Sequence, residues 1–109
     1  MYGHQLLNTF ERLRALGLTD SRAGFSTQWC GKNEGLLRDY TRRDGPTAKV
    51  NPRVVARLRQ RLIQAASLLP DHLAAQVREI DAGIERDLRV ADLLGRRSLS
   101  RNMENDLDC

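Results

Sequence analysis

"FSTQWCGKNEGLLRDY", residues 25–40, decides how this chain is expected to fold. Phe25 and Trp29 are four residues apart, so they share one face of a helical run. That run breaks at Gly31, and a second helical run follows almost at once. A glycine at the break permits a left-handed backbone, which a sharp corner between two helices requires. The stretch therefore predicts two short helices that meet at an angle.

Capping residues set the expected bounds of these two helices. The polar triplet at residues 19–21, "TDS", supplies caps for a helix predicted over 22–29. Asn33 is a good N-cap for the next helix, and Glu34 in its first turn complements the helix dipole. That helix is predicted over 34–42, with a leucine and a tyrosine on its buried side.

Apolar periodicity predicts three further helices, over 5–16, 52–67 and 72–94. Gly17 offers a stop for the first, and the pair Asn51-Pro52 offers a cap and a first helical residue for the second. Leu and Ala outnumber Val and Ile, which favours helices over sheets. The fold class expected is all-α, with five helices.

Charge divides the chain into two unlike parts. Residues 1–61 hold 12 Arg or Lys and 5 Asp or Glu, whereas residues 62–109 hold 6 Arg and 9 acidic residues. The balances are therefore +7 and −3. A basic first half suggests a face for a polyanion, while a solvated surface of mixed charge is the plainer alternative.

Several classes of protein are disfavoured. The chain has two cysteines, Cys30 and Cys109, no basic leader and no apolar run of membrane-spanning length, so we expect a reduced cytoplasmic protein. His4 and His72 lack partners at metal-ligand spacing, and no phosphate-binding glycine loop or nucleophile elbow is present. We expect no enzyme activity, no metal and no cofactor.

A glycine-containing turn between the second and third helices is what a helix-turn-helix requires. The stretch resembles the helix-turn-helix regulators of the phage-repressor and Cro type. In those proteins apolar residues lie six and nine positions after the turn glycine, and from Gly31 these steps reach Leu37 and Tyr40. The similarity covers roughly residues 5–69. The chain is also similar to small bacterial proteins with an "FSxxWxGK"-like second helix.

Two departures from the family pattern bear on the register. Thr27 occupies the position, four before Gly31, where the family usually has a smaller residue. Phe25 and Trp29 also lie one step out of the usual register, which allows a turn one residue longer. The set of side chains that faces outward is therefore open to a shift of one position.

The resemblance implies that the outer face of the third helix reads DNA bases. The residues expected to face the groove are Asn33, Glu34, Gly35, Arg38 and Asp39. Arg38 is the strongest candidate, because a guanidinium can donate two hydrogen bonds to O6 and N7 of guanine. Asn33 is open to two interpretations, a base contact or a helix cap. Glu34 is equally open, as an acceptor from cytosine N4 or as a surface residue.

Basic and polar residues flank this face and suit the DNA backbone. The candidates for phosphate contacts are Arg22, Gln28, Lys32, Arg42, Arg43 and Lys49. If six such contacts form, the logarithm of the binding constant falls with the logarithm of salt concentration at a slope of roughly −5. Any one of these side chains alone could equally be solvated.

The helix over 72–94 has an apolar seam close to that of a coiled coil, interrupted at Asp87. The candidates for a dimer interface are Leu73, Val77, Ile80, Ile84, Leu88 and Ala91. The alternative is that the seam packs back on helices 5–16 and 52–67. The expected domains are 1–69 for the DNA-binding unit, 70–97 for the dimerisation or packing helix, and 98–109 for a disordered acidic tail.

Taken together, these patterns predict a dimeric transcriptional regulator, of the repressor kind, that binds double-stranded DNA in a sequence-specific way. The alternative is a protein-interaction adaptor, either an anti-activator or an antitoxin, that binds a protein partner through helix 72–94. No membrane association is expected in either case.

Overall fold

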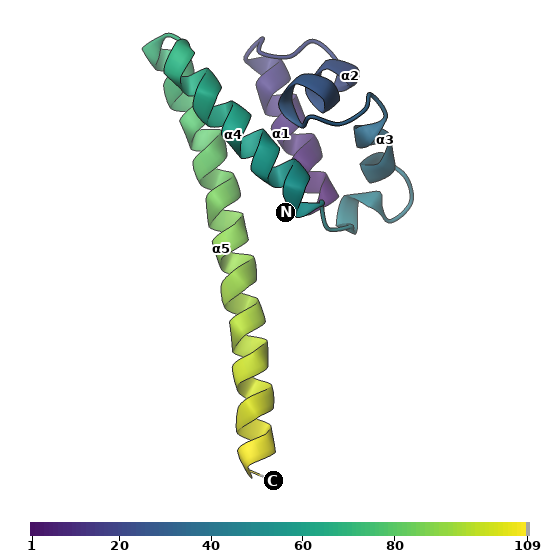
Figure 1. Cartoon of the computed structure of the whole chain (residues 1–109), viewed down its shortest axis with the longest axis vertical. Helices are drawn as coiled ribbons and strands as arrows, with labels where there is room; N and C mark the ends of the chain where they lie inside the picture. Colours follow the sequence, from purple (N-terminus) through teal and green to yellow (C-terminus); the bar gives the residue numbers. More distant parts are fainter. Residues whose placement is uncertain (109) are drawn as a thin grey trace.

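In the computed structural model, which describes the backbone of residues 1–108 and the side chains of residues 1–93, helices follow one another with no strand between them. Their order is α1 (Gly3–Ala15), α2 (Arg22–Gly24), the π-helical turn η1 (Phe25–Trp29), α3 (Leu36–Thr41), the 3-10 turn η2 (Gly45–Thr47), α4 (Pro52–Leu68) and α5 (Asp71–Asp108). Figure 1 shows α1, α2 and α3 grouped on one side of α4, with α5 along its other side. The predicted all-α class with five helices is confirmed.

Helix α1 ends where its sequence predicts. Gly17 has a φ of 75°, and the Leu18 N–H donates to the Leu13 carbonyl at 3.0 Å, a Schellman arrangement that satisfies a carbonyl of the last turn. Leu18 then folds back against the core. Phe10 and Leu13 are buried on the inner face of the helix.

The second helix starts as predicted and continues differently. The Ser21 hydroxyl caps it by accepting from the Gly24 N–H at 3.0 Å. From Phe25 onward the helix widens, because the Cys30 N–H bonds to the Phe25 carbonyl at 3.2 Å, five residues back. The Ser26 hydroxyl, which is buried, donates to a backbone carbonyl of the preceding turn. The prediction of one regular helix over 22–29 is thus wrong in its hydrogen-bond pattern, since η1 is a π-helical turn.

The core lies where α1, η1 and α4 meet. Phe25 is fully buried, and its ring meets Phe10 edge-on at a centroid distance of 5.5 Å. Trp29 is 8% exposed, so it belongs to the core together with Phe25, as predicted for Trp29.

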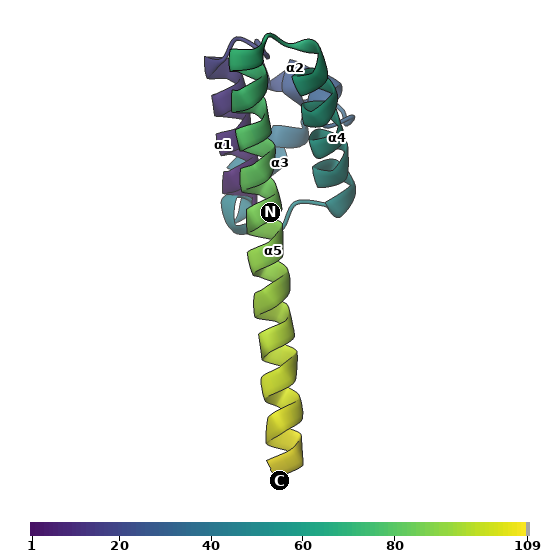
Figure 2. The same ribbon diagram turned by 90° about the vertical axis from the view of Figure 1, so that its left-hand side faces the viewer.

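Helices α4 and α5 form an antiparallel pair (Figures 1 and 2). Asn51 caps α4 by accepting from the Arg53 N–H at 2.9 Å, and Pro52 is the first helical residue, as predicted. The buried residues of the pair are Val54, Val55, Leu58, Leu62 and Ala66 from α4, and Ala74, Val77, Ile80 and Ile84 from α5.

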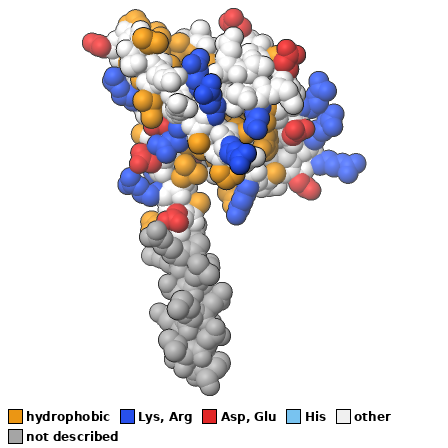
Figure 3. Space-filling model, viewed as in Figure 1, with side chains coloured by type: hydrophobic (Ala, Val, Ile, Leu, Met, Phe, Trp, Pro, Cys, Tyr) orange, Lys and Arg blue, Asp and Glu red, His pale blue; other side chains and the backbone are white. Residues whose placement is uncertain are grey.

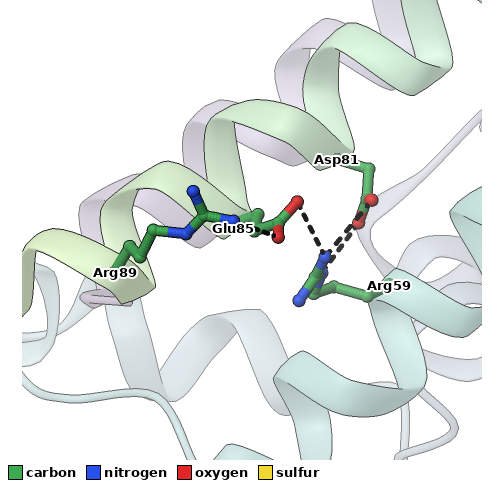
Figure 4. A network of polar contacts seen from close by, with 4 residues as sticks. All are labelled: Arg59, Asp81, Glu85 and Arg89. Carbon is green, nitrogen blue, oxygen red and sulfur yellow. Dashed lines mark hydrogen bonds and ion pairs between the residues drawn. The ribbon is translucent and has the colours of Figure 1, made fainter. Parts of the chain in front are cut away.

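A network of charged side chains joins the two helices (Figure 4). Arg59 of α4 donates to Asp81 at 2.9 Å and lies 3.7 Å from Glu85, which also accepts from Arg89 at 2.9 Å. The hydrogen bond with Asp81 raises the pKa of Arg59 above its ordinary value. The network therefore holds the side of α4 that bears Arg59 against α5.

Helix α5 is longer than the predicted 72–94, because it continues through Gly95 to Asp108. Its C-terminal part extends past the other helices (Figure 2). The disordered acidic tail predicted over 98–109 overlaps this extension: the backbone of residues 98–108 is helical, and Cys109 lies outside the described residues.

Candidate nucleic-acid interface

The corner between η1 and α3 turns at Gly31, as the sequence predicts. Gly31 has a φ of 65°, a left-handed conformation that a residue with a side chain rarely adopts. The Lys32 N–H then donates to the Ser26 carbonyl at 2.9 Å, which satisfies a carbonyl at the end of the widened helix. The glycine thus closes η1 and redirects the chain toward α3.

The turn is longer than predicted, since residues 30–35 separate η1 from α3. The Asn33 side-chain oxygen accepts from the Gly35 N–H at 3.0 Å, so its role in the structure is to hold the turn. Because Gly35 is the N-cap, α3 begins at Leu36, and the helix predicted over 34–42 is wrong at its start. It also ends at Thr41, after which Arg42 is extended and Arg43 has a φ of 35°.

Helix α3 presents one buried and one exposed side. Leu36 and Leu37 are buried, and Tyr40 packs against the core, which confirms the predicted inner face. Arg38 and Asp39 are exposed on the other side. Of the five residues expected to face bases, two thus lie on α3 itself, and Asn33, Glu34 and Gly35 lie in the turn before it.

Two glycines, Gly3 and Gly45, allow close backbone packing at the C-terminal end of α3. A Cβ on Gly45 would lie 2.5 Å from the Asp39 carbonyl oxygen and 2.7 Å from the Tyr40 Cα. A Cβ on Gly3 would collide with the Gly45 carbonyl oxygen. The start of α1, η2 and the end of α3 therefore pack backbone against backbone. The turn signal at Gly45 was visible in the sequence, but its contact with Gly3 depends on the tertiary fold.

All six residues expected to contact phosphates have exposed side chains. They are Arg22, Gln28, Lys32, Arg42, Arg43 and Lys49. The ion pairs found among the described residues join Arg59 and Arg89 to acids of α5, and none involves these cations. Figure 3 shows Lys and Arg side chains over the side of the molecule that carries α3 and over α4, with Asp and Glu side chains among them. The structure leaves the predicted basic surface open to an anionic partner.

Two arginines of α4 that were not among the predicted contacts also reach this surface. The Arg61 Nε donates to the Gln28 carbonyl at 3.0 Å, close to the end of η1. The Arg57 side chain lies against Gly31, with its Cγ 3.2 Å from the position of a Cβ on that glycine. Their even spacing along one face of α4 was the signal that could have found them.

Part of the seam predicted as a dimer interface is buried within a single chain. Val77, Ile80 and Ile84 are no more than 4% exposed within a single chain, because they pack against the apolar face of α4. This part of the seam follows the alternative, packing back on the chain itself. Leu73 and Leu88 are half-buried, and Ala91 is exposed.

The free end of the seam borders an apolar groove of about 590 Å³. Leu88 and Ala91 line its α5 side, and Tyr2, Val50 and Val55 are among the residues opposite them. No residue of η1 or α3 lines the groove, whereas Lys49, one of the predicted phosphate contacts, does.

Cys30 is buried at the end of η1, and burial raises the pKa of its thiol to about 12. A thiol that stays protonated at neutral pH is a weak nucleophile, so Cys30 serves as a small apolar core residue.

Along the described residues, no cluster of His, Cys, Asp or Glu suited to a metal ion is found. No helix in that part of the chain is both long enough and apolar enough to cross a bilayer.

No protein-family model matches this chain, and searches of curated proteins and of solved structures returned no significant match.

Proposed function

We propose that this chain is a sequence-specific transcriptional regulator, a repressor, that binds double-stranded DNA through α3 and the turn before it. The observation that carries the proposal is the exposed side of α3. Arg38 projects from a helix whose opposite side, Leu36 and Leu37, is anchored in the core. An exposed arginine on an anchored helix suits the major groove, where it can donate two hydrogen bonds to guanine.

The surroundings of α3 support the same function. Lys32 lies in the turn before the helix and Arg42 and Arg43 follow it, and all three are exposed without an ion pair among the described residues. Exposed cations on both sides of a groove-reading helix would contact phosphates of the two strands and fix its register. Asp39 beside Arg38 would disfavour a misplaced phosphate at the centre of the face.

The proposed helix-turn-helix differs in detail from those of the family that the sequence resembles. Its turn comprises residues 30–35 and its recognition helix only Leu36–Thr41. Asn33 is occupied as a hydrogen-bond acceptor from Gly35, so it is a weaker candidate for a base contact than Arg38. We infer that Arg38 carries most of the base discrimination.

We also propose that the regulator acts as a dimer. One short recognition helix contacts few base pairs, and pairing two copies on a two-fold site multiplies the specificity. The surface for a second copy is the groove bordered by Leu88 and Ala91, because the central residues of the seam, Val77, Ile80 and Ile84, are covered within the chain. An exposed apolar surface of this kind is typical of a protein interface.

The adaptor function is the second candidate, and the same groove is the observation that favours it. An anti-activator or antitoxin would use Tyr2, Leu88 and Ala91 to bind a different protein. It would have no need for the unpaired cations around α3, which is why DNA binding is the better-supported proposal.

The test removes one guanidinium. A duplex is first selected from a random pool by the wild-type protein, and binding is then measured by fluorescence anisotropy. We expect Arg38→Ala to weaken binding to the selected duplex roughly 5- to 150-fold, the equivalent of about 1–3 kcal/mol, while binding to random duplex changes little. Arg78→Ala, which removes the same charge from an exposed position on α5, is the control. Equal affinities for the Arg38→Ala and Arg78→Ala variants would contradict the proposal.

A further inference from the structure

Helix α4 carries four arginines whose surroundings differ. Arg59 faces α5 and is paired there with Asp81 and Glu85. The other three, Arg53, Arg57 and Arg61, recur at every fourth residue, so they form a row along one face of the helix. That row faces away from the acids of α5 and toward the basic half of the molecule.

Contacts with η1 and its turn place this row beside the proposed DNA-binding surface. Arg61 donates from Nε to the Gln28 carbonyl at 3.0 Å and from Nη1 to Gln64 at 3.2 Å. One turn earlier, the Arg57 Nε lies 3.3 Å from the position that a Cβ on Gly31 would occupy. The stem of Arg57 therefore lies along the backbone that leads directly to Lys32.

The row differs in how its members use their donors. Arg61 is half-buried and donates hydrogen bonds to Gln28 of η1 and Gln64 of α4, so it positions the corner. Arg53 and Arg57 are exposed, and no hydrogen bond or ion pair of their guanidinium groups is found among the described residues. Each therefore keeps a full set of donors available to a partner.

We propose that Arg53 and Arg57 of α4, together with Lys32 of the turn, form a phosphate-binding row. This row binds the DNA backbone beside the major groove that α3 enters. This rests on the proposed function, and it adds a second structural element to the interface. Three cations that share a surface repel one another unless an anion lies between them. Successive phosphates of one strand supply such anions, and a guanidinium can bind a phosphate with two parallel hydrogen bonds.

The packing of Arg57 against Gly31 links the phosphate-binding row to the turn before α3. Because Arg57 packs on the corner glycine, a phosphate held by Arg57 is held at a fixed distance from the start of α3. Contacts to phosphates fix the orientation of a protein on a duplex without reading its sequence. The row would thus set the depth and angle at which α3 enters the groove.

The experiment measures the salt dependence of binding for the double variant Arg53→Ala/Arg57→Ala on selected and random duplexes. Alanine favours the helix, so α4 should stay folded, which circular dichroism can verify. We expect the slope of log affinity against log salt to become less steep by about 2, with equal weakening on both duplexes. The variant Arg53→Lys/Arg57→Lys keeps the charges and should keep most of the slope.

The control is Arg78→Ala/Arg86→Ala, which removes two exposed arginines of α5 and should leave the slope unchanged. If the two double-alanine variants show the same slope while wild-type protein binds DNA, the phosphate-binding row is wrong and the proposed function stands. If the wild-type protein binds no duplex at all, both proposals fail.

Discussion

At the scale of single residues, Gly31 meets two constraints at once. Its φ of 65° lies in the left-handed region, where a side chain costs about 1–2 kcal/mol. Its missing Cβ also leaves room for Arg57, whose Cγ comes within 3.2 Å of that position. Gly83 in α5 meets neither constraint, since it is helical and a Cβ there would contact nothing within 4 Å.

These two glycines make a matched pair of substitutions. Gly31→Ala should lower the free energy of unfolding by about 1–2 kcal/mol, because an alanine is strained at this positive φ and its methyl group displaces Arg57. Gly83→Ala should raise it by about 0.5–1 kcal/mol, because alanine restricts the unfolded chain and favours the helix. Urea denaturation followed by circular dichroism measures both. Equal stability of the two variants would show that an alanine at position 31 is not strained.

At the scale of elements, α5 has two parts with different surroundings. Its first part, including Val77 and Ile84, is covered by the rest of the chain. Its seam continues to Leu88 and Ala91, where it borders the apolar groove. The proposed dimer depends on this second part, because Leu88 is half-buried and Ala91 is exposed beside the groove.

A pair of lysine substitutions separates the two faces of α5. Ala91 lines the groove, whereas Ala82 is exposed on the outer side of the helix, away from the buried seam. Ala91→Lys should shift the protein from dimer to monomer in sedimentation equilibrium, because it places a solvated charge in an apolar contact. Ala82→Lys should leave the dimer intact. A dimer that survives Ala91→Lys would mean that the groove is not the interface.

At the scale of the whole molecule, the sequence predicted those features that depend on local chemistry. The stop at Gly17, the caps at Ser21 and Asn51, and the corner at Gly31 all follow from residues adjacent to the feature. Helix α4 was placed almost to the residue because its apolar stripe and its cap agree.

The features that the sequence missed depend on competition between similar backbone states or on distant contacts. Whether the turn before α3 ends at Asn33 or Gly35 depends on one side-chain hydrogen bond, and that choice set the register. The burial of Val77 could not be separated from dimerisation, because an apolar seam looks the same whichever surface covers it. The contact of Arg57 with Gly31 arises only once α4 crosses the corner.

The central claim is that α3, its turn and the adjacent face of α4 bind duplex DNA, and NMR titration tests it most directly. A uniformly ¹⁵N-labelled sample would be titrated with the selected duplex, and the shifts of the backbone amides would be mapped on the structure. We predict that the largest shifts fall on residues 31–43, with further shifts around Arg53 and Arg57, and none around Tyr2 or Ala91 beyond those caused by dimerisation. Shifts confined to the groove beside Ala91, or no shifts at all, would contradict the account.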